Sequence, residues 1–513
     1  MASSDPVLLR KIVDILWEMK PKRVLDVGFG FGKVGFLTRE YLDVYFHRNY
    51  HKREWTTVVD GIEIWPDFIT DVHRHLYDHI HIGDAVDVLP GLGHYDVIFM
   101  MDVIEHIPKE MGKRLLEIAR KHARKVVVST PSFHMEQGEI LGNPHERHVS
   151  FWTEDELGGR CEKAGPLLIS IGDGEEPKDF HIVCEGEPGW AVRHLGLDIM
   201  GFLKENGLKV HPPHDWRSER DISLVKRIVE EDLSARLYVS TGPAAEFIHE
   251  NWGVPREQMF WVLHSVDDLL DFHKRYRGEP PPTQEERMRF LRDVPGDESM
   301  REAIGRYAGI GYLSKEQERI LNAIGVDDAF HTPQYVDTEL FKPRNRVSEG
   351  PLRVGAALAT TAHPARKGVP LLSKIVGMIR GRDDMVFDPR AIRGPMNSFG
   401  LPFDQMPSYF DEVDVLVCTA FSEGGPLPPL QAGACEVPTI STRCGHMPEF
   451  VIDGETGFLV DADPDEFMRI LSSLSEDRGM LQRIGSASRQ HVIDHWSIVV
   501  NCPKWLRMIQ EIR

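Results

Sequence analysis

The sequence predicts an α/β protein with three successive α/β regions, each built on a parallel sheet. Short apolar runs alternate with helical patterns throughout the 513 residues, and this alternation is typical of βαβ units. Two interruptions divide the pattern into three sets, and a glycine-rich loop follows an apolar strand in the first and in the last set. At ~150 residues per domain, the length also allows about three compact domains.

The composition excludes several classes of protein. The chain is 41% hydrophobic and 27% charged, with a formal net charge of −20 at pH 7. This charge disfavours general nucleic-acid binding, because such proteins collect Lys and Arg to displace counterions. No apolar run reaches the ~18 residues of a membrane span, and the first residues form an amphipathic helix start and not a secretion signal. We therefore expect a soluble cytoplasmic protein without a membrane span, and the sequence leaves its oligomeric state open.

The six cysteines indicate neither disulfides nor a zinc site. They show no CxxC spacing, and most of them lie in apolar strand or helix contexts. We expect buried, reduced thiols, because free cysteine behaves as a small hydrophobic side chain.

Two interruptions set the expected domain limits. The apolar runs RVLDVGFG, TTVVDGIEI, YDVIFMMDVI and KVVVSTP precede the segment GDGEEPKD (172–179), whose glycines, proline and acids break the pattern. A second break occurs at FKPRNRVSEGP. The predicted domains are 1–178, 179–343 and 344–513, and the final helix could cross back onto the second domain.

A glycine-rich loop follows the first predicted strand, within residues 24–37. Glycines at this spacing let the backbone turn sharply and approach a ligand closely, although a simple tight turn would also account for them. The next strand ends at Glu63, where a carboxylate can accept hydrogen bonds from both hydroxyls of a ribose. Asp84 follows the strand after that and could accept from an adenine amino group.

Residues 1 to 180 resemble the class I S-adenosylmethionine-dependent methyltransferases. The resemblance rests on DVGFGFG, on Glu63, on GDA at 83–85, and on YDVIFMMDVIEHIP at 95–108 followed by VVVSTPS. It implies S-adenosylmethionine as the methyl donor. The residues that it implies are Asp26, Gly28, Gly30 and Gly32 for the methionine part, Glu63 for the ribose, Asp84 and Ala85 for the adenine, and Asp102 for the methyl-transfer cleft.

The acceptor side of this domain is less well defined. The segment SFHMEQGEILGNPHERHVSFW contains His134, His145 and His148 in a loop after a strand. A neutral imidazole could take a proton from a hydroxyl acceptor, and His145 and His148 are the preferred candidates for this base. The same histidines could instead be packing or capping residues or metal ligands, but nothing in the spacing fixes a ligand geometry. His106 lies near the start of a helix and could cap it.

A second glycine-containing loop occurs in FSEGGPLPPLQAGACEVP (421–438). A buried strand stops at Gly424 and Gly425, and a helix follows with prolines in its first turn. A helix N-terminus beside a glycine loop can hold phosphate, and Glu423 just before it can bond sugar hydroxyls. Gln431, two turns on, would point at a neighbouring part of the same ligand. The loop therefore predicts a nucleotide-sugar site, with a polar strand-to-helix turn as the alternative.

Residues 181 to 513 resemble the retaining glycosyltransferases of the GT-B type, which have two Rossmann-like domains facing across a cleft. Besides the loop, the resemblance rests on TPQYVDTELFKP, ARKGVPLL, MPSYFDEVDVLV and GHMPEFVIDGETGFLV. The roles that it implies are Lys367 for the donor diphosphate, Glu423 for the donor sugar, Gly424 and Gly425 against sugar or phosphate, Gln431 for the nucleotide ribose, and His264 for the donor sugar near the reaction centre.

Two positions depart from the family pattern. Position 431 is normally Glu, and Gln431 keeps an acceptor oxygen but loses the charge, so weaker ribose binding is expected. The expected basic partner before Lys367 is replaced by Thr361, which leaves Arg366 as a substitute. The segment EGEPGWAVRHLGL (185–197) supplies the glycine-containing turn of the first half. No DxD motif before a strand end is evident, and because helix dipoles and basic side chains can stabilise the leaving diphosphate, we predict no metal.

Together the two resemblances predict a bifunctional carbohydrate-modifying enzyme. The expected fold class is α/β, with an N-terminal class I methyltransferase Rossmann-like domain followed by a GT-B pair of Rossmann-like domains. The enzyme would transfer a sugar, with retention, from a nucleotide-sugar donor and a methyl group from S-adenosylmethionine to a glycan or glycoconjugate. Two alternatives stay open: a glycosyltransferase with a non-catalytic methyltransferase-like domain, and a methyltransferase carrying a degenerate sugar-binding GT-B module.

Overall fold

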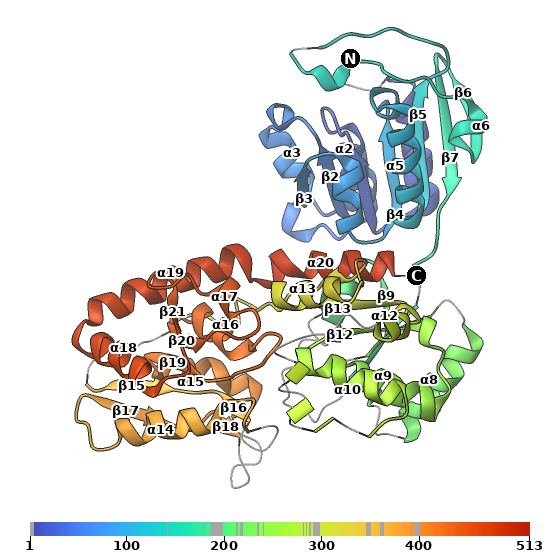
Figure 1. Ribbon diagram of the computed structural model, residues 1–513. Coiled ribbons are helices and arrows are strands. Elements are labelled where there is room, and N and C mark those ends of the chain that lie inside the picture. Colours follow the sequence, from blue (N-terminus) through green and yellow to red (C-terminus); the bar gives the residue numbers. More distant parts are fainter. Residues whose placement is uncertain are drawn as a thin grey trace. The chain divides into compact units, whose positions relative to one another are not determined.

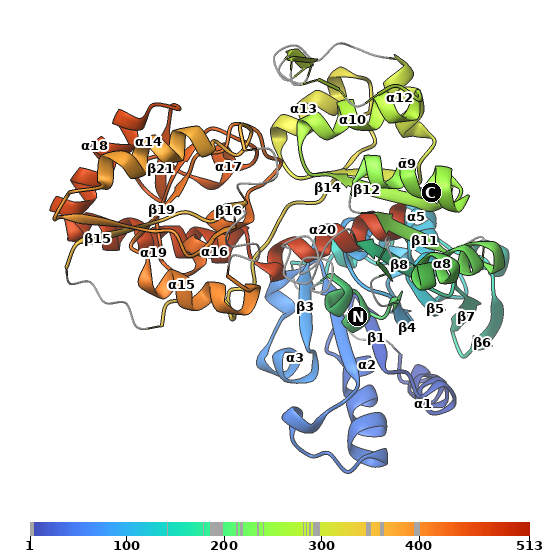
Figure 2. The same ribbon diagram turned by 90° about the horizontal axis from the view of Figure 1, so that it is seen from below.

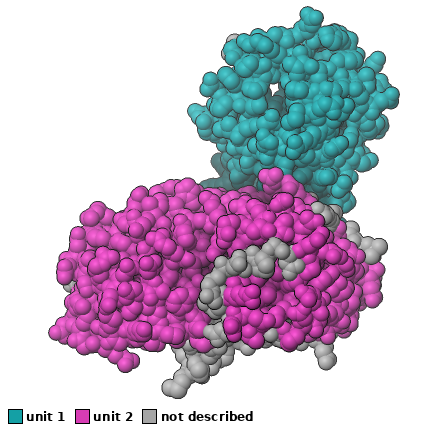
Figure 3. Space-filling model, in the orientation of Figure 1, with its two compact units in different colours: residues 1–179, 202–209 teal, residues 180–201, 210–513 magenta. Residues whose placement is uncertain are grey.

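The computed structural model describes the chain except for residues 1–4, 141, 178, 185–198, 212–213, 216–218, 233–234, 240, 281, 284, 287–288, 291–297, 345–349, 360–363, 394–400 and 513. The predicted turn at 185–197 and Thr361 thus lie outside the described residues. The chain forms two compact units (Figure 3): unit 1 comprises residues 1–179 and 202–209, and unit 2 comprises residues 180–201 and 210–513. The predicted boundary between residues 343 and 344 falls within unit 2 and stays a prediction.

Unit 1 is built on a seven-stranded sheet (Figure 1). Its strands are β1 (Arg23–Val27), β2 (Val58–Glu63), β3 (His79–Ile82), β4 (Tyr95–Met101), β5 (Ala123–Pro131), β6 (Arg160–Ala164) and β7 (Leu167–Asp173). The order is β3-β2-β1-β4-β5-β7-β6; β1 to β5 run parallel, whereas β7 is antiparallel to both of its neighbours. The chain reverses its direction of travel across the sheet between β1 and β4, and ligands of open α/β sheets bind at the carboxyl ends of strands at such a switch point.

Helices cover both faces of this sheet. They are α1 (Leu8–Met19), α2 (Lys33–Thr38), α3 (Asp71–Leu76), α4 (Ala85–Val88), α5 (Lys109–Lys121), α6 (Glu154–Leu157) and the π-helix η1 (Arg39–Phe46). The short 3-10 helices are η2 (Lys52–Glu54), η3 (Pro66–Phe68), η4 (Leu89–Gly91), η5 (Ile104–His106) and η6 (Pro144–Glu146). Successive strand residues point to opposite faces, so Val24 packs with α1 in one core cluster and Leu25 packs with α5 in another.

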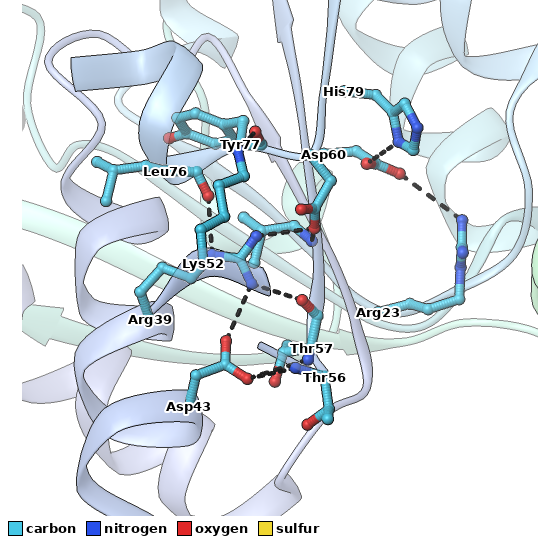
Figure 4. Close-up of polar contacts among 12 residues, drawn as sticks. Arg23, Arg39, Asp43, Lys52, Thr56, Thr57, Asp60, Leu76, Tyr77 and His79 are labelled. Atoms are coloured by element: carbon cyan, nitrogen blue, oxygen red, sulfur yellow. Dashed lines mark hydrogen bonds and ion pairs between the residues drawn. The ribbon is translucent and has the colours of Figure 1, made fainter. Parts of the chain in front are cut away.

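A buried arginine ties the π-helix to the strands beside it (Figure 4). The Arg39 side chain is 3% exposed and donates hydrogen bonds to Asp43 Oδ2 at 2.9 Å and to the carbonyl oxygen of Leu76 at 2.8 Å. Asp43 in turn accepts from the backbone N–H of Thr57, whose carbonyl oxygen also accepts from Arg39. Buried polar backbone groups need such partners, so Arg39 fixes the chain that leads into Tyr77.

Unit 2 contains two larger parallel sheets. The strands of the first are β8 (Asp179–Cys184), β9 (Lys209–Val210), β10 (His214–Asp215), β11 (Arg236–Val239), β12 (Met259–Leu263), β13 (Gly309–Tyr312) and β14 (Phe330–His331), in the order β10-β8-β11-β12-β13-β14 with β9 beside β8. The strands of the second are β15 (Leu352–Gly355), β17 (Met385–Asp388), β19 (Val415–Cys418), β20 (Thr439–Thr442) and β21 (Gly457–Val460), in the order β17-β15-β19-β20-β21. A small pair is formed by β16 (Leu358–Ala359) and β18 (Ile392–Arg393).

The helices of unit 2 alternate with these strands. They are α8 (Glu219–Glu231), α9 (Gly242–Trp252), α10 (Val266–Tyr276), α12 (Glu298–Gly305), α13 (Lys315–Ala323), α14 (Val369–Ile379), α15 (Met406–Glu412), α16 (Leu427–Ala434), α17 (Met447–Phe450), α18 (Pro464–Glu476), α19 (Arg478–His495) and α20 (Ile498–Glu511), with the 3-10 helices η7 (Arg256–Gln258) and η8 (Phe403–Gln405). Parallel strands covered on both faces read as continuous apolar runs, and every residue of β12 is buried.

The last helix, α20, returns to the first sheet of unit 2 (Figure 2). Its Trp505 donates a hydrogen bond from Nε1 to the carbonyl oxygen of Pro333 at 3.0 Å. The same ring meets Tyr238 of β11 edge to face, with centroids 5.8 Å apart. These contacts attach the end of the chain to β11 and to the segment after β14. Among the described residues, no helix has both the length and the apolar character that crossing a bilayer requires.

Candidate functional sites

A pocket of about 350 Å³ opens at the switch point of the unit 1 sheet. Its wall comes from the carboxyl ends of β1, β2 and β4 and from segments after β1, β2, β3, β4 and β5. Of the predicted site residues, it contains Asp26, Gly28, Gly30, Glu63, Asp84, Ala85, Asp102 and His145. Gly32 and His148, which were also predicted, are not part of this wall. Residues from five separate stretches of sequence therefore meet in one cavity.

The glycine loop has a backbone that favours glycine. Gly28 and Gly30 have φ angles of 63° and 53°, in the left-handed region that other residues seldom adopt. There is also no room for a side chain at Gly28, because an added Cβ would lie 2.7 Å from Cγ2 of Val103. Gly28 is therefore required both by its backbone conformation and by the close approach of the loop after β4.

His73 supports the loop from outside the predicted set. The backbone N–H of Thr70 donates to His73 Nδ1 at 2.9 Å, so the ring hydrogen is on Nε2. Nε2 lies 2.9 Å from the carbonyl oxygen of Gly30 and donates to it. The ring also packs against Phe29 with centroids 5.0 Å apart. The sequence offered no signal for this contact beyond the presence of a histidine in a short helix.

Two acids at the ends of β1 and β2 are buried in the pocket wall. Asp26 is 2% exposed and accepts a hydrogen bond from the Tyr77 hydroxyl at 2.6 Å. Burial raises the pKa of Asp26 to about 7, although the Tyr77 hydrogen bond acts in the opposite direction. Burial also raises the pKa of Glu63, whose Oε1 accepts from the backbone N–H of Trp65 at 2.9 Å. A cationic ligand in the pocket would favour the charged form of both acids.

Asp102 and Asp84 have partners within the protein. Asp102 follows β4 with φ 57°, which is uncommon for a residue other than glycine, and Ser129 Oγ donates to its Oδ1 at 2.7 Å. Burial raises the pKa of Asp102. Asp84 caps α4, because its Oδ1 accepts from the backbone N–H of Val86 at 2.9 Å. This cap gives Asp84 a structural role in addition to its place in the pocket wall.

The candidate histidines lie in different places. His145 is in the pocket wall, with its ring centroid 6.0 Å from that of Trp65. His148 instead meets His106 edge to face, with centroids 4.9 Å apart. His134 is exposed. Of the two preferred bases, only His145 is in the wall of the cofactor pocket; His106, the less favoured candidate, is there too.

The suggested capping role of His106 is wrong. α5 begins at Lys109 after Pro108, and no side chain caps it. The Nδ1 atom of His106 lies 3.1 Å from the carbonyl oxygen of Arg147. Burial lowers the pKa of His106 to about 4 and raises the pKa of its neighbour Glu105 to about 8. His106 thus links the segment after β4 to the loop that carries His148.

In unit 2, the predicted donor residues Lys367 and Glu423 form an ion pair. Lys367 Nζ contacts Glu423 Oε1, and the two side chains are 26% and 11% exposed. Glu423 lies in the loop between β19 and α16, and Lys367 lies just before α14. The pair brings a cation and an acid to one end of the second sheet, where the resemblance placed the diphosphate and the sugar.

The glycine pair after Glu423 packs closely against protein. The backbone N–H of Gly424 donates to the carbonyl oxygen of His264 at 2.6 Å, and an added Cβ would lie 2.2 Å from that oxygen. An added Cβ on Gly425 would lie 2.4 Å from Nδ1 of His446. The structure therefore brings His264 to the loop through its backbone, and contacts within the protein already require both glycines.

Arg366 and Gln431 also have defined positions. Arg366 Nη1 donates to Ser265 Oγ at 2.8 Å, and the Arg366 carbonyl accepts from the backbone N–H of Phe421 at 2.7 Å. Gln431 is 3% exposed within α16, which begins at Leu427 with prolines in its first turn. The helix start predicted from those prolines is present at this place.

His446 packs against this loop at Gly425, although the sequence analysis did not identify it as a site residue. It is fully buried, and its ring centroid lies 4.9 Å from that of Trp496. Burial lowers its pKa to about 3, so the ring is neutral near pH 7. It occurs in the quoted run GHMPEFVIDGETGFLV, but only the fold brings it against Gly425.

Two family models match the chain. One, described as "Methyltransferase domain", matches residues 1–170, and the other, described as "Glycosyl transferases group 1", matches residues 398–491. The chain therefore contains a methyltransferase domain and a group 1 glycosyltransferase domain. The first match covers the pocket of unit 1, and the second covers the loop at 421–438.

Several curated proteins are similar to parts of the chain. A GDP-mannose-dependent alpha-(1-6)-phosphatidylinositol monomannoside mannosyltransferase of Mycolicibacterium smegmatis is 26% identical over 241 residues, which are 40% of this chain and 60% of that protein. A D-inositol 3-phosphate glycosyltransferase of an Arthrobacter species is 24% identical over 295 residues, which are 51% and 66% of the two chains. An MMP alpha-(1->4)-mannosyltransferase of Mycolicibacterium hassiacum is 28% identical over 194 residues, 34% and 46% of the two chains. The chain thus spans less than two thirds of the length of each of these relatives.

Solved glycosyltransferase structures also resemble the chain. Sucrose-phosphate synthase from Thermosynechococcus elongatus has a TM-score of 0.49 at 13% identity, covering 63% of this chain and 96% of that one. Anabaena HepE, solved with UDP and glucose, has a TM-score of 0.44 at 14% identity, covering 63% and 97%. We infer nothing about function from these two. The parallel sheets and the family matches confirm the predicted fold class, a Rossmann-like methyltransferase domain followed by a GT-B glycosyltransferase.

Proposed function

We propose that this protein is a bifunctional transferase. It would move a methyl group from S-adenosylmethionine, and a sugar with retention from a nucleotide-sugar donor, to a glycan or glycoconjugate. The observation that carries the proposal is that one chain has both an acid-lined pocket at the switch point of a methyltransferase domain and a glycosyltransferase domain whose Glu423 pairs with Lys367. We also propose the division into domains 1–178, 179–343 and 344–513.

The pocket of unit 1 suits a cofactor that carries positive charge. The methionine part of S-adenosylmethionine has an ammonium and a sulfonium group, and buried Asp26 stands at the glycine loop where we place that part. Glu63, at the end of the neighbouring strand β2, would accept from the ribose hydroxyls. Asp84 and Ala85, at the start of α4, would hold the adenine.

The acceptor would enter beside Asp102 and His145. Both are in the pocket wall, on the side formed by the segments after β4 and β5. A neutral imidazole at His145 could take the proton of an acceptor hydroxyl. His148 is not in this wall, so we give the role of base to His145.

In unit 2 we assign the donor to the loop between β19 and α16. Lys367 would bind the diphosphate and Glu423 the sugar hydroxyls, with each side chain leaving or sharing the ion pair that joins them in the structure. Arg366 would add a second positive charge, and Gln431 would bind the ribose. Because one curated relative is named as GDP-mannose-dependent, GDP-mannose is the first donor to test.

Two assays on the purified chain test the proposal. Titration with S-adenosylmethionine should show one site per chain, and at least one member of a panel of GDP- and UDP-sugars should be turned over. If no heat appears with S-adenosylmethionine but sugar turnover occurs, the first domain is a non-catalytic module. If S-adenosylmethionine binds and no sugar nucleotide is bound or consumed, the GT-B half is degenerate.

A further inference from the structure

Three side chains with metal-ligating atoms meet in unit 1 outside the cofactor contacts described above. The ligand atoms of Glu105, His106 and His148 all lie within 4.8 Å of one another. Glu105 and His106 belong to the short helix η5 after β4, whereas His148 belongs to the loop after β5. The fold therefore joins groups that are far apart in the sequence, at the edge of a pocket to which His106 contributes.

The carboxyl group of this cluster is incompletely paired. Glu105 is 2% exposed, and its Oε2 atom has no hydrogen-bond partner among the described residues. A buried polar atom without a partner is costly, and such atoms in native proteins call for a bound ion or water or a functional role. A cation at this oxygen would remove the cost.

Both imidazoles are fixed by hydrogen bonds to backbone carbonyl oxygens. Nδ1 of His148 lies 2.8 Å from the carbonyl oxygen of Met135, and Nδ1 of His106 lies 3.1 Å from that of Arg147. A carbonyl oxygen only accepts, so each Nδ1 carries the hydrogen and each Nε2 keeps its lone pair. Metal-ligating histidines commonly donate their other ring N–H to a backbone carbonyl in this way.

We propose that Glu105, His106 and His148 bind one divalent transition-metal cation at the edge of the cofactor pocket. Two imidazole nitrogens and one carboxylate suit Mn²⁺, Fe²⁺, Co²⁺ or Zn²⁺ better than Ca²⁺ or Mg²⁺, which prefer oxygen ligands. Three protein ligands leave coordination positions open, as in catalytic metal sites. This proposal replaces the expectation of no metal for the first domain.

The role of the cation follows from its place. Because His106 belongs both to the cluster and to the pocket wall, an open coordination position would face the cavity in which the acceptor is expected. The cation would hold one or two acceptor oxygens and orient them toward the methyl donor. This role rests on the proposed methyl transfer, whereas the binding of the metal does not.

Metal binding is tested on the full chain after treatment with EDTA and dialysis. Calorimetric titration with MnCl₂, CoCl₂ and ZnCl₂ should show one cation per chain, with MgCl₂ and CaCl₂ binding more weakly. Glu105→Gln, His106→Gln and His148→Gln should each raise the dissociation constant by about tenfold or more. His134→Gln is the matched control, because His134 is exposed on the same loop and is not in the cluster, and it should bind as the wild type does.

The proposal is overturned if the wild-type chain binds none of the three transition metals, or if the variants of both cluster histidines bind them as tightly as the control. A variant that fails to fold does not decide the matter, so pulsed electron paramagnetic resonance of the Mn²⁺-loaded wild type is the second measurement. It should show couplings to imidazole nitrogen, and their absence also refutes the site.

S-adenosylmethionine titrations separate this inference from the proposed function. Binding of S-adenosylmethionine without any metal binding would refute the metal site alone. Metal binding without S-adenosylmethionine binding would refute the proposed methyl transfer and leave the metal site standing.

Discussion

Replacing Gly28 by alanine tests the geometry of the glycine loop. With φ at 63°, an alanine there bears a left-handed strain of about 1–2 kcal/mol. The new Cβ would also lie 2.7 Å from Val103 Cγ2, so Val103 must leave its rotamer at a cost of about 0.5–1.5 kcal/mol. Together these costs amount to about 1.5–3.5 kcal/mol.

We expect this cost to appear as lost affinity for S-adenosylmethionine. The unliganded loop can relax, whereas the bound loop has to keep the wild-type backbone around the ligand. Since each 1.4 kcal/mol corresponds to a factor of about ten, the dissociation constant of Gly28→Ala should rise by about tenfold to a few hundredfold. Isothermal titration calorimetry with S-adenosylmethionine measures it directly.

A second substitution separates the contact from the backbone strain. Gly28→Ala/Val103→Ala removes the methyl groups that the new Cβ would strike but keeps the left-handed strain. Corrected for Val103→Ala alone, it should bind about threefold to tenfold more tightly than Gly28→Ala, as the double-mutant cycle requires. Wild-type affinity in Gly28→Ala, or no recovery in the double variant, would refute the reasoning.

Three further predictions concern stability, pH and the donor site. Arg39→Met should destabilise unit 1 by about 3–5 kcal/mol because it leaves Asp43 buried without its cation. Arg10→Met, which removes the cation of the exposed Arg10–Asp14 pair, should cost less than about 1 kcal/mol. Thermal unfolding of the two variants compares these losses. Since the pKa of Asp26 is raised from 3.8 to about 7, the wild type should lose stability relative to Asp26→Asn as the pH rises from about 4 to 7, so the unfolding temperature of the wild type minus that of the variant should be lower at pH 8 than at pH 5. Glu423→Ala should lower sugar-nucleotide turnover by about tenfold or more, and Gln431→Ala should lower it less, because a hydrogen bond to a charged group is worth more than a neutral one.

Each of these predictions has a result that would contradict it. Equal losses of stability in the two arginine variants would mean that the buried pair contributes no more than a surface pair. A wild type that gains stability relative to Asp26→Asn between pH 5 and pH 8 would reverse the sign expected for an acid with a raised pKa. Turnover that depends on Gln431 and not on Glu423 would remove the loop at 421–438 from the donor site.

The strands of the unit 1 sheet differ in how clearly the sequence predicts them. β1 and β4 are buried on both faces, so RVLDV and YDVIFMM read as apolar runs. The strand β6, RCEKA, is exposed or half-buried throughout and has no such signal. The antiparallel pair of β6 and β7 was therefore not predicted, and neither was the π-helix that carries Arg39.

The same distinction applies to the candidate sites. Glu63 ends a strand and Asp84 lies just after one, so their place at the edge of a parallel sheet can be inferred from local order. The hydrogen bond of Tyr77 to Asp26 and the meeting of His148 with Glu105 join distant segments. Such contacts depend on the path of the chain, and residue spacing does not show them.

The central claim is that one chain carries two separate transferase sites. Titrating both ligands against one variant of each site tests this claim most directly. The wild type, Glu63→Gln and Lys367→Ala are each titrated with S-adenosylmethionine and with the sugar nucleotide that the wild type binds. We predict that Glu63→Gln weakens only the binding of S-adenosylmethionine and that Lys367→Ala weakens only the binding of the sugar nucleotide. A wild-type chain that binds just one of the two ligands, or a variant that loses both while folded, would contradict the claim.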